Sequence, residues 1–447
     1  MRYHKNFIQF LIMVLFVVLL THGAYADDTP PVGQSKSEPS SSIPEGQSKE
    51  KPVPEDEGIG SDIFGKQGGN FHPFVIFQEV YTDNLFATHT NTKSDFITTI
   101  APGVWLAFPA NREKLLSIDT TTTSPGGLNL SRIKPETTRR YQSYFLYSPE
   151  FLLYSDHSSL DHVNHKAEGL FQYNLSSGLS FDIIDIFHDR EDIAGNGIID
   201  TLYRYKDNLL DLVATYAAPS GKFKFELDYS NYDINYEDLA ASYRNRNDDS
   251  FGISAFYQFW PKTSLFVEYN FADIDFDGGT STDSIENRYY AGATWDMTAN
   301  TRGTLKLGYI QKDFDAPTIE DQDGFSVELQ TQHNLTPKRG LQISGYRKFH
   351  ESDFGGASTF LSSGINVALL QRFSEKWTGT FDVSFEKNEY KGFDRADDLF
   401  GIGPAVRFEP RKWLIFDLGY NYYLNDSNIT TYDYEANQIY FRATLSL

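Results

Sequence analysis

Apolar and polar side chains alternate along most of the chain from Phe71 onward. In the stretch from Tyr434 to Leu447, for example, Ile439 and Phe441 alternate with Tyr440 and Arg442. Successive side chains on a strand point to opposite faces, so each such stretch predicts a strand with one apolar and one polar face. We expect eighteen strands, at 71–81, 95–108, 141–154, 164–175, 179–190, 203–217, 222–233, 248–260, 264–276, 286–298, 302–314, 324–334, 339–350, 360–373, 377–390, 395–408, 413–423 and 434–447.

The connections between these strands alternate between short turns and longer polar segments. The short turns are expected at 176–178, 219–221, 261–263, 299–301, 336–338, 374–376 and 409–411, where Gly, Pro, Asn and Ser supply turn geometry. The longer segments lie near 191–202, 234–247, 277–285, 315–323, 351–358, 391–396 and 424–433. This layout is typical of a transmembrane antiparallel up-and-down β-barrel, all-β, with its short turns in the periplasm.

One connection breaks the rhythm. Residues 109–140 form a long insert where a short periplasmic turn is expected, and Leu115, Leu116 and Ile118 make it partly apolar. We interpret it as an extra hairpin or a plug, which leaves a sixteen-strand barrel as the alternative to eighteen strands.

Alternation alone does not name the solvent, because a soluble β-sandwich also alternates, with its polar face outside. Here 15% of the residues are aromatic although the mean hydropathy is negative, as expected when polar lumen residues offset lipid-facing ones. Asp185 and Arg347 fit a lipid face poorly, which leaves the register of their strands open. The net charge of −22 disfavours nucleic acid as a partner.

The N-terminus has the pattern of an export signal. Arg2, His4 and Lys5 precede a short apolar run that ends before Ala24-Tyr25-Ala26. This predicts a signal peptide at 1–26, and no later stretch is long and apolar enough for a transmembrane helix. Residues 27–70 are rich in Pro, Ser and charge and are expected to form a disordered periplasmic tail, and 71–447 the outer-membrane barrel.

The polar faces of the strands are expected to line the lumen. In the best-separated strands, Phe381, Val383 and Phe385 oppose Asp382 and Glu386. The expected lumen residues are Glu226, Asp228, Glu268, Asn270, Lys306, Glu328, Arg372, Asp382, Glu386, Arg407, Asp417 and Arg442.

Two short motifs raise the question of metal binding. Asp273-x-Asp275-x-Asp277-Gly278 opens like a calcium loop, but Ser284 occupies the position of the bidentate Glu. His157, His162 and His165 crowd one predicted loop, where solvated side chains are the simpler interpretation. Hydrolase motifs and a glycine-rich phosphate loop are lacking, so we predict no metal, no cofactor and no enzymatic activity.

The start of the predicted barrel resembles a known family. Tyr81-Thr82-Asp83-Asn84-Leu85-Phe86 and the run from Ser94 to Gly103, with Tyr147 to Phe151 later, are similar to the opening of the putative β-barrel porin 2 family. The resemblance implies an association with exopolysaccharide or capsule export, with a periplasmic polysaccharide export protein and a glycan as partners. The C-terminal strand resembles the closing strand of outer-membrane barrels, which implies recognition by the barrel-assembly machinery; Leu447 stands where Phe is usual.

Three functions remain open from the sequence: a polysaccharide-export conduit, a general diffusion porin, and a structural or adhesive barrel. A porin usually carries a long inward loop and an adhesin large outer loops, whereas the predicted loops are short. In a glycan conduit, Trp105, Tyr290 and Trp260 are expected to stack on sugar rings or to pack against a plug. Small residues on the polar faces are expected to leave room for a passing chain; these are Gly292, Gly364 and Gly403.

Overall fold

The described part of the computed structural model comprises residues 69–109, 140–193, 202–277, 282–298, 301–352 and 358–446. It forms one closed antiparallel sheet of eighteen strands, in which each strand pairs with its neighbours in sequence and β1 pairs with β18. The strands are β1 Phe71–Thr82, β2 Asp95–Phe108, β3 Tyr141–Tyr154, β4 His162–Asn174, β5 Leu179–Ile193, β6 Leu202–Ala217, β7 Phe223–Tyr236, β8 Arg246–Trp260, β9 Thr263–Phe276, β10 Ser284–Thr298, β11 Thr301–Phe314, β12 Gln322–Thr336, β13 Arg339–Glu351, β14 Thr359–Arg372, β15 Trp377–Tyr390, β16 Ala396–Arg411, β17 Leu414–Ser427 and β18 Tyr434–Ser446.

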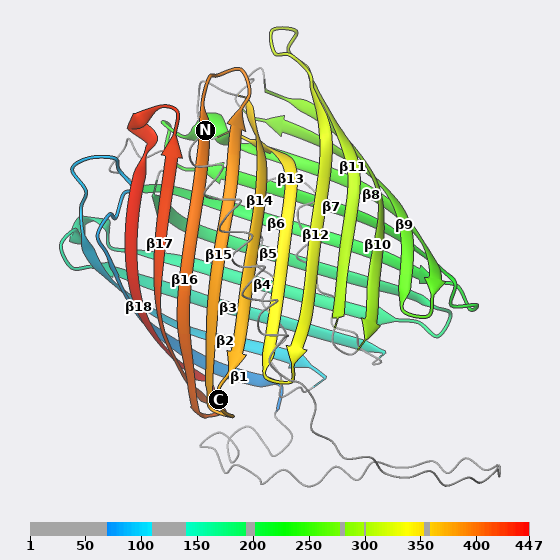
Figure 1. Ribbon diagram of the computed structural model, residues 1–447, viewed down its shortest axis with the longest axis horizontal. Coiled ribbons are helices and arrows are strands. Elements are labelled where there is room, and N and C mark those ends of the chain that lie inside the picture. Colours follow the sequence, from blue (N-terminus) through cyan, green and yellow to red (C-terminus); the bar gives the residue numbers. More distant parts are fainter. Residues whose placement is uncertain are drawn as a thin grey trace, which may run out of the picture. The chain divides into compact units, whose positions relative to one another are not determined.

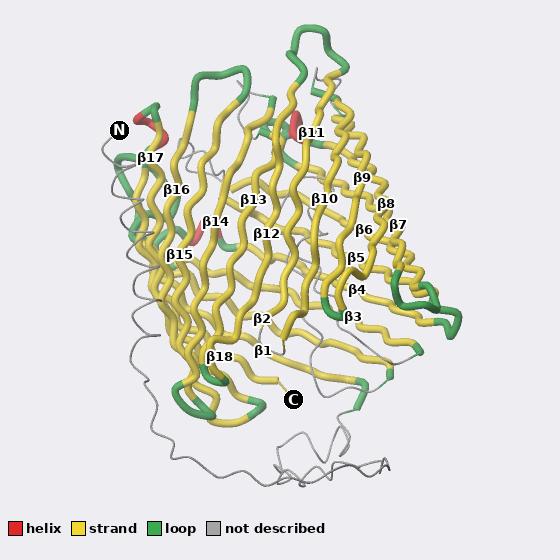
Figure 2. Tube along the Cα trace, turned by 45° about the vertical axis from the view of Figure 1, so that its right-hand side comes forward, coloured by secondary structure: helices red, strands yellow, loops and turns green. Residues whose placement is uncertain are grey.

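The barrel prediction and the count of eighteen strands are confirmed. The strands labelled β12 to β17 run at a steep angle across those labelled β3 to β6 on the opposite wall, as expected for tilted strands in a closed barrel (Figure 1). Within the described residues, helix is confined to single turns in the connections, η1 Ser158–Leu160, η2 Ser242–Arg244 and η3 Thr430–Tyr432 (Figure 2). None of the helices in the described part of the chain has the length and apolar character to cross a bilayer.

One predicted turn is wrong. We expected β16 to end before Glu409-Pro410-Arg411, but the strand continues to Arg411 and the turn is Lys412–Trp413. The pairing of β16 with β17 is irregular between Phe408 and Arg411. Proline cannot donate to a strand ladder but is accommodated at such an irregularity, so Pro410 marks a bulge here and not a turn.

Several other predictions fall on residues outside the described ranges. These are the signal peptide at 1–26, the tail up to residue 68, and the insert from 110 to 139.

The two faces of the sheet differ as predicted. Side chains on the outer face are apolar and exposed, such as Leu227, Val267 and Phe325, whereas the alternate positions are largely polar and buried. The register of these two strands, which the sequence left open, puts Asp185 and Arg347 on the outer face. Asp185 accepts a hydrogen bond from Asn208 on the same face (2.7 Å). Arg347 donates to Ser363 Oγ (2.8 Å). Each is satisfied by a polar neighbour on the adjacent strand.

The family-like segment Asp83-Asn84 holds the junction between the first and last strands. Asp83 accepts hydrogen bonds from the backbone and side-chain nitrogens of Asn437, both 2.7 Å. Asn84 Nδ2 donates to the carbonyls of Thr88 (2.8 Å) and Glu435 (2.9 Å). The segment therefore closes the barrel at the end that carries the longer loops, which we call the loop end; the opposite end is the turn end.

Candidate functional site

The loop end of the β13–β14 hairpin leaves the barrel wall. Pairing of β13 with β12 ends at Arg347 and Val327, whereas β13 stays paired with β14 as far as Glu351 and Thr359. We call residues 348–351 and 359–362 the hairpin end. Because β12 still pairs with β11 up to Gln322, the sheet is split between β12 and β13 only at this level.

The hairpin end bends toward the inside of the barrel. Phe349 is only 2% exposed and packs against Leu361 and against Ile310 of β11. It also lies beside the position that a side chain on Gly324 of β12 would occupy. Ile310 and Gly324 belong to the inner face, so Phe349 lies over the inner surface of β11 and β12. The missing side chain of Gly324 leaves room for it.

A set of charged side chains packs around and below the hairpin end. Lys312 Nζ lies 2.7 Å from Glu351 Oε1 and 3.7 Å from Glu286 Oε2, and Glu286 also pairs with Arg288. Nearer the turn end, Lys306 pairs with the carboxylates of Glu268 and Glu328 across the inner face. Arg246 and Asp248 form a further buried pair (3.0 Å). We call the whole set the inner ion cluster; its members are Arg246, Asp248, Glu268, Glu286, Arg288, Lys306, Lys312, Glu328, Lys348 and Glu351.

Ion pairs in this cluster span strands that are not adjacent. Lys306 of β11 lies 2.8 Å from Glu268 of β9 and 3.5 Å from Glu328 of β12. Tyr290 of β10 also donates to Ser326 of β12 (3.0 Å). Side chains converge in this way on the concave face of a barrel and diverge on the convex face, which places the cluster inside.

The inner ion cluster is buried, and its cations and carboxylates are equal in number. None of its ten residues is more than 8% exposed, and its five cations match its five carboxylates. Isolated buried charges are very unfavourable, so this pairing is what makes the arrangement possible. In the sector from β8 to β13 the lumen is therefore filled by side chains at the level of the cluster.

The sector from β13 to β18 differs. A recess of about 270 Å³ opens on its inner face, lined by Tyr346, Tyr423, Tyr434, Glu386 and smaller polar side chains. Tyr423 remains 41% exposed. We call this the tyrosine recess.

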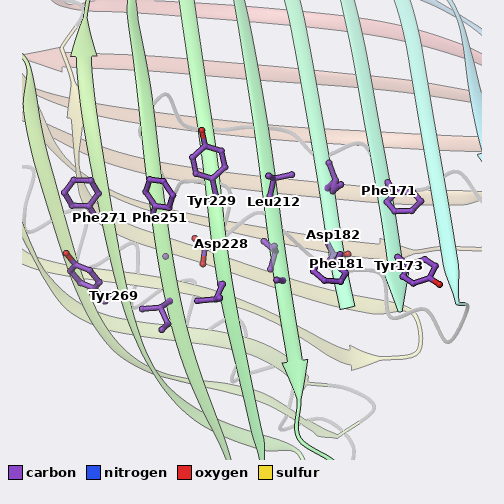
Figure 3. Close-up of a pocket in the computed structure, with 16 residues that line it drawn as sticks. Phe171, Tyr173, Phe181, Asp182, Leu212, Asp228, Tyr229, Phe251, Tyr269 and Phe271 are labelled. Atoms are coloured by element: carbon purple, nitrogen blue, oxygen red, sulfur yellow. The ribbon is translucent and has the colours of Figure 1, made fainter. Parts of the chain in front are cut away.

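A larger recess, of about 780 Å³, lies on the outer face across β4 to β9. Its lining is mainly apolar and aromatic, including the exposed Phe251, Leu227 and Ile253. Figure 3 shows Phe171, Tyr229, Phe251 and Phe271 along this surface. Since that face meets the membrane, the recess is not a candidate for a water-borne solute.

Four of the twelve predicted lumen residues, Glu268, Asn270, Lys306 and Glu328, come together in and beside the inner ion cluster, where Asn270 donates to Glu268 (2.7 Å). Asp228 lies beside Asn270, because both side chains cover Gly252. The remaining seven lie elsewhere on the polar strand faces. Three of them form ion pairs with a neighbour or with each other: Glu226 pairs with Lys224 (3.0 Å), and Arg407 pairs with Asp417 (2.7 Å). Arg442 donates a hydrogen bond to Gln78 (2.6 Å), and Glu386 accepts hydrogen bonds from Tyr346 and Asn388. Asp228 and Asp382 are half-buried, and Arg372 is exposed at the turn end.

Of the three aromatic residues expected to contact a glycan, two are buried and one lies at the end of its strand. Trp105 is 2% exposed and stacks on His72 (3.7 Å), and Tyr290 is 5% exposed, so neither presents a free ring. Trp260 is exposed, but at the irregular turn end of β8.

The expected open space at the three glycines is also occupied. The ring of Phe266 lies over Gly292, that of Tyr346 over Gly364, and Asn421 Oδ1 covers Gly403. These glycines admit a neighbouring side chain across the strand pair, as in other twisted sheets.

The candidate metal ligands have separate partners. His157 Nδ1 lies 2.7 Å from Asp95, His162 Nδ1 2.7 Å from the Leu160 carbonyl, and His165 Nδ1 2.9 Å from Tyr147. Over the described ranges no group of three His, Asp or Glu side chains is arranged to hold a metal ion. Gly278 of the calcium-like motif lies outside those ranges.

The comparisons with known proteins agree with this architecture. Residues 62–447 match the family described as "Putative beta-barrel porin 2". The chain belongs to this family. The match confirms the resemblance seen at Tyr81 to Gly103, and places the chain among outer-membrane barrels of the porin type.

Solved structures with a similar fold include three from pseudomonads. The outer membrane protein OpdK of Pseudomonas aeruginosa is 9% identical, with a TM-score of 0.47, over 85% of this chain and 99% of that one. A BenF-like porin from Pseudomonas fluorescens Pf-5 is 8% identical, with a TM-score of 0.46, over 84% and 99%. The ferric enterobactin receptor PfeA of P. aeruginosa, a mutant form, is 8% identical, with a TM-score of 0.44, over 86% and 81%. No curated protein matches the chain.

Proposed function

We propose that this outer-membrane pore is a conduit for a hydrated saccharide chain during exopolysaccharide or capsule export. The observation that supports this best is the contrast between the two inner sectors. Ten charged side chains from β8 to β13 are buried together in the inner ion cluster, whereas the recess from β13 to β18 presents hydroxyl, amide and tyrosine groups and a single carboxylate, that of Glu386. A surface without free charge clusters lets a hydrated neutral chain slide without being held tightly.

The proposal assigns the chain no catalytic step and no cofactor. It also includes a partner: a periplasmic polysaccharide export protein that delivers the chain to the turn end of the barrel. That role follows from the family resemblance at Asp83-Asn84 and its neighbours.

A second candidate, a diffusion porin for small solutes, gains support from the hairpin end. The short predicted loops argued against a porin, because porins usually narrow their lumen with an inward loop. The hairpin end would take the place of such a loop, since it packs on the inner surface with Phe349 beside Gly324 and Glu351 on Lys312.

The two candidates are separated by deleting the gene. For a conduit, we expect surface polysaccharide to be lost while uptake of small nutrients stays nearly unchanged. Normal polysaccharide secretion in a deletion strain without a second copy would overturn the conduit and leave the porin. Conductance of the purified barrel in planar bilayers then measures the width of the pore directly.

A further inference from the structure

The tyrosine recess lies directly below the narrowing, on the turn-end side of the hairpin end. Tyr346 is two residues before Lys348, where β13 has left the wall, and the Lys348 ammonium lies 5.4 Å from the Tyr346 ring centroid. A substrate that moves along the inner face from β13 to β18 would therefore pass the recess next to the hairpin end.

We propose that the tyrosine recess binds one sugar ring of the passing substrate. The proposal rests on the proposed function in taking a saccharide as the substrate, but it concerns a specific site. The volume of about 270 Å³ corresponds to about nine water molecules at about 30 Å³ each, which suits a single ring and not an oligosaccharide.

The aromatic part of the lining suits the apolar side of a sugar ring. Tyr423, Tyr434 and Tyr346 all contribute to the recess, and each combines an apolar ring with a polar hydroxyl. Gly364 lies beneath Tyr346, because a Cβ there would be 2.7 Å from the ring. The glycine thus lets Tyr346 lie flat against the wall and leaves the recess in front of it open.

The polar part of the lining suits hydroxyl groups. Ser344, Asn366 and Ser384 line the recess, and none of these three side chains is hydrogen-bonded to another residue in the described part of the chain. They present free donors and acceptors on the same wall as the tyrosines. A few placed polar groups among aromatic side chains are the usual composition of a small-ligand site.

Glu386 supplies acceptor oxygens for hydroxyl groups. Its carboxylate already accepts hydrogen bonds from Tyr346 Oη and from Asn388 Nδ2 (2.8 Å). Two donors stabilise and orient the carboxylate without a counter-ion, while its remaining lone pairs can accept hydrogen bonds from sugar hydroxyls. An ammonium ligand remains the rival, and the experiment includes it.

The test uses the full mature barrel reconstituted in planar bilayers, with maltohexaose as the saccharide probe and lysine as the cation probe. We expect maltohexaose to block the current reversibly. The substitution Tyr423→Ala should raise the blocking concentration about tenfold, a loss of roughly one good contact. Glu386→Gln, which keeps an acceptor oxygen, should raise it less. The matched control Tyr289→Ala removes a 46% exposed tyrosine from the outer face and should change nothing.

Circular dichroism and a difference in gel migration between unheated and heated samples show that each variant is folded. Equal effects of Tyr423→Ala and Tyr289→Ala would overturn the proposal. So would block by lysine that Glu386→Gln removes, with no block by maltohexaose. If the deletion strain secretes polysaccharide normally while maltohexaose still blocks through Tyr423, the sugar site stands and the export function fails. If the deletion strain loses secretion but maltohexaose does not block the current, the export function stands and the sugar site fails.

Discussion

Lys312 is the side chain on which the loop end of the inner ion cluster depends. It is fully buried, and its ammonium connects Glu351 of the hairpin end (2.7 Å) with Glu286 of β10 (3.7 Å). We therefore consider the substitution Lys312→Met, which keeps the length of the side chain and removes its charge.

The magnitude follows from what the substitution leaves behind. Glu286 keeps its pairing with Arg288, but Glu351 is left buried, 5% exposed, without its 2.7 Å partner. Removing one member of a buried ion pair typically lowers the free energy of unfolding by about 3–5 kcal/mol. The double variant Lys312→Met/Glu351→Leu removes both charges and should recover most of that loss, since an apolar pair of similar volume is often neutral.

The assay is urea unfolding of the barrel in lipid vesicles, followed by tryptophan fluorescence. Lys387→Met is the matched control, because Lys387 pairs with Asp398 (3.3 Å) while both side chains are more than one-third exposed. Exposed pairs contribute less than about 1 kcal/mol. A loss for Lys312→Met no larger than that of the control, or a double variant as unstable as the single one, would refute the assignment of Lys312 as a buried link.

Three further outcomes are expected. Leu418→Arg on the outer face should destabilise the barrel folded in vesicles by about 2–4 kcal/mol near the bilayer midplane, and Asp382→Asn far less. Equal losses would contradict the assignment of faces. Gly308→Val should reduce the folded fraction, measured by gel migration of unheated samples, because a Cβ there would meet backbone and ring atoms closer than 3 Å. Gly340→Ala, with its nearest neighbour at 3.7 Å, should fold normally. Sequencing of the exported protein should give Asp27 as the first residue, and an intact signal sequence would exclude cleavage there.

The strands were predictable because their period of two is set locally by each residue and its neighbours. The hairpin end was not, although residues Arg347 to Glu351 carry a visible signal. Arg347 and Lys348 are adjacent, as are His350 and Glu351, so polar groups occupy both faces where one should be apolar. The sequence shows that break in alternation, but not that the strand pair turns inward. That depends on Gly324 and Ile310, which lie on other strands.

The inner ion cluster was only partly predictable for a related reason. Lys306, Glu268 and Glu328 were expected on the polar faces, and Lys306 pairs with Glu328 on the adjacent strand. The contact of Lys306 with Glu268, however, crosses from β11 to β9 and depends on the curvature of the wall. Strand patterns give the face of a side chain and its neighbours on adjacent strands. They do not give the packing across the concave side.

The junction of β1 with β18 has a consequence for the order of assembly. Seventeen of the eighteen strand pairings join strands that are consecutive in the chain, whereas the β1–β18 junction includes Asp83 and Asn437, 354 positions apart. Bringing such distant segments together costs about 3 kcal/mol more in chain entropy than closing a loop of about 10 residues. Until then the sheet has two unpaired edges, which are prone to associate with other chains. The contacts of Asp83 with Asn437 and of Asn84 with Glu435 form only across the closed junction, so we expect them to lengthen the lifetime of the finished barrel and not to speed the formation of its hairpins.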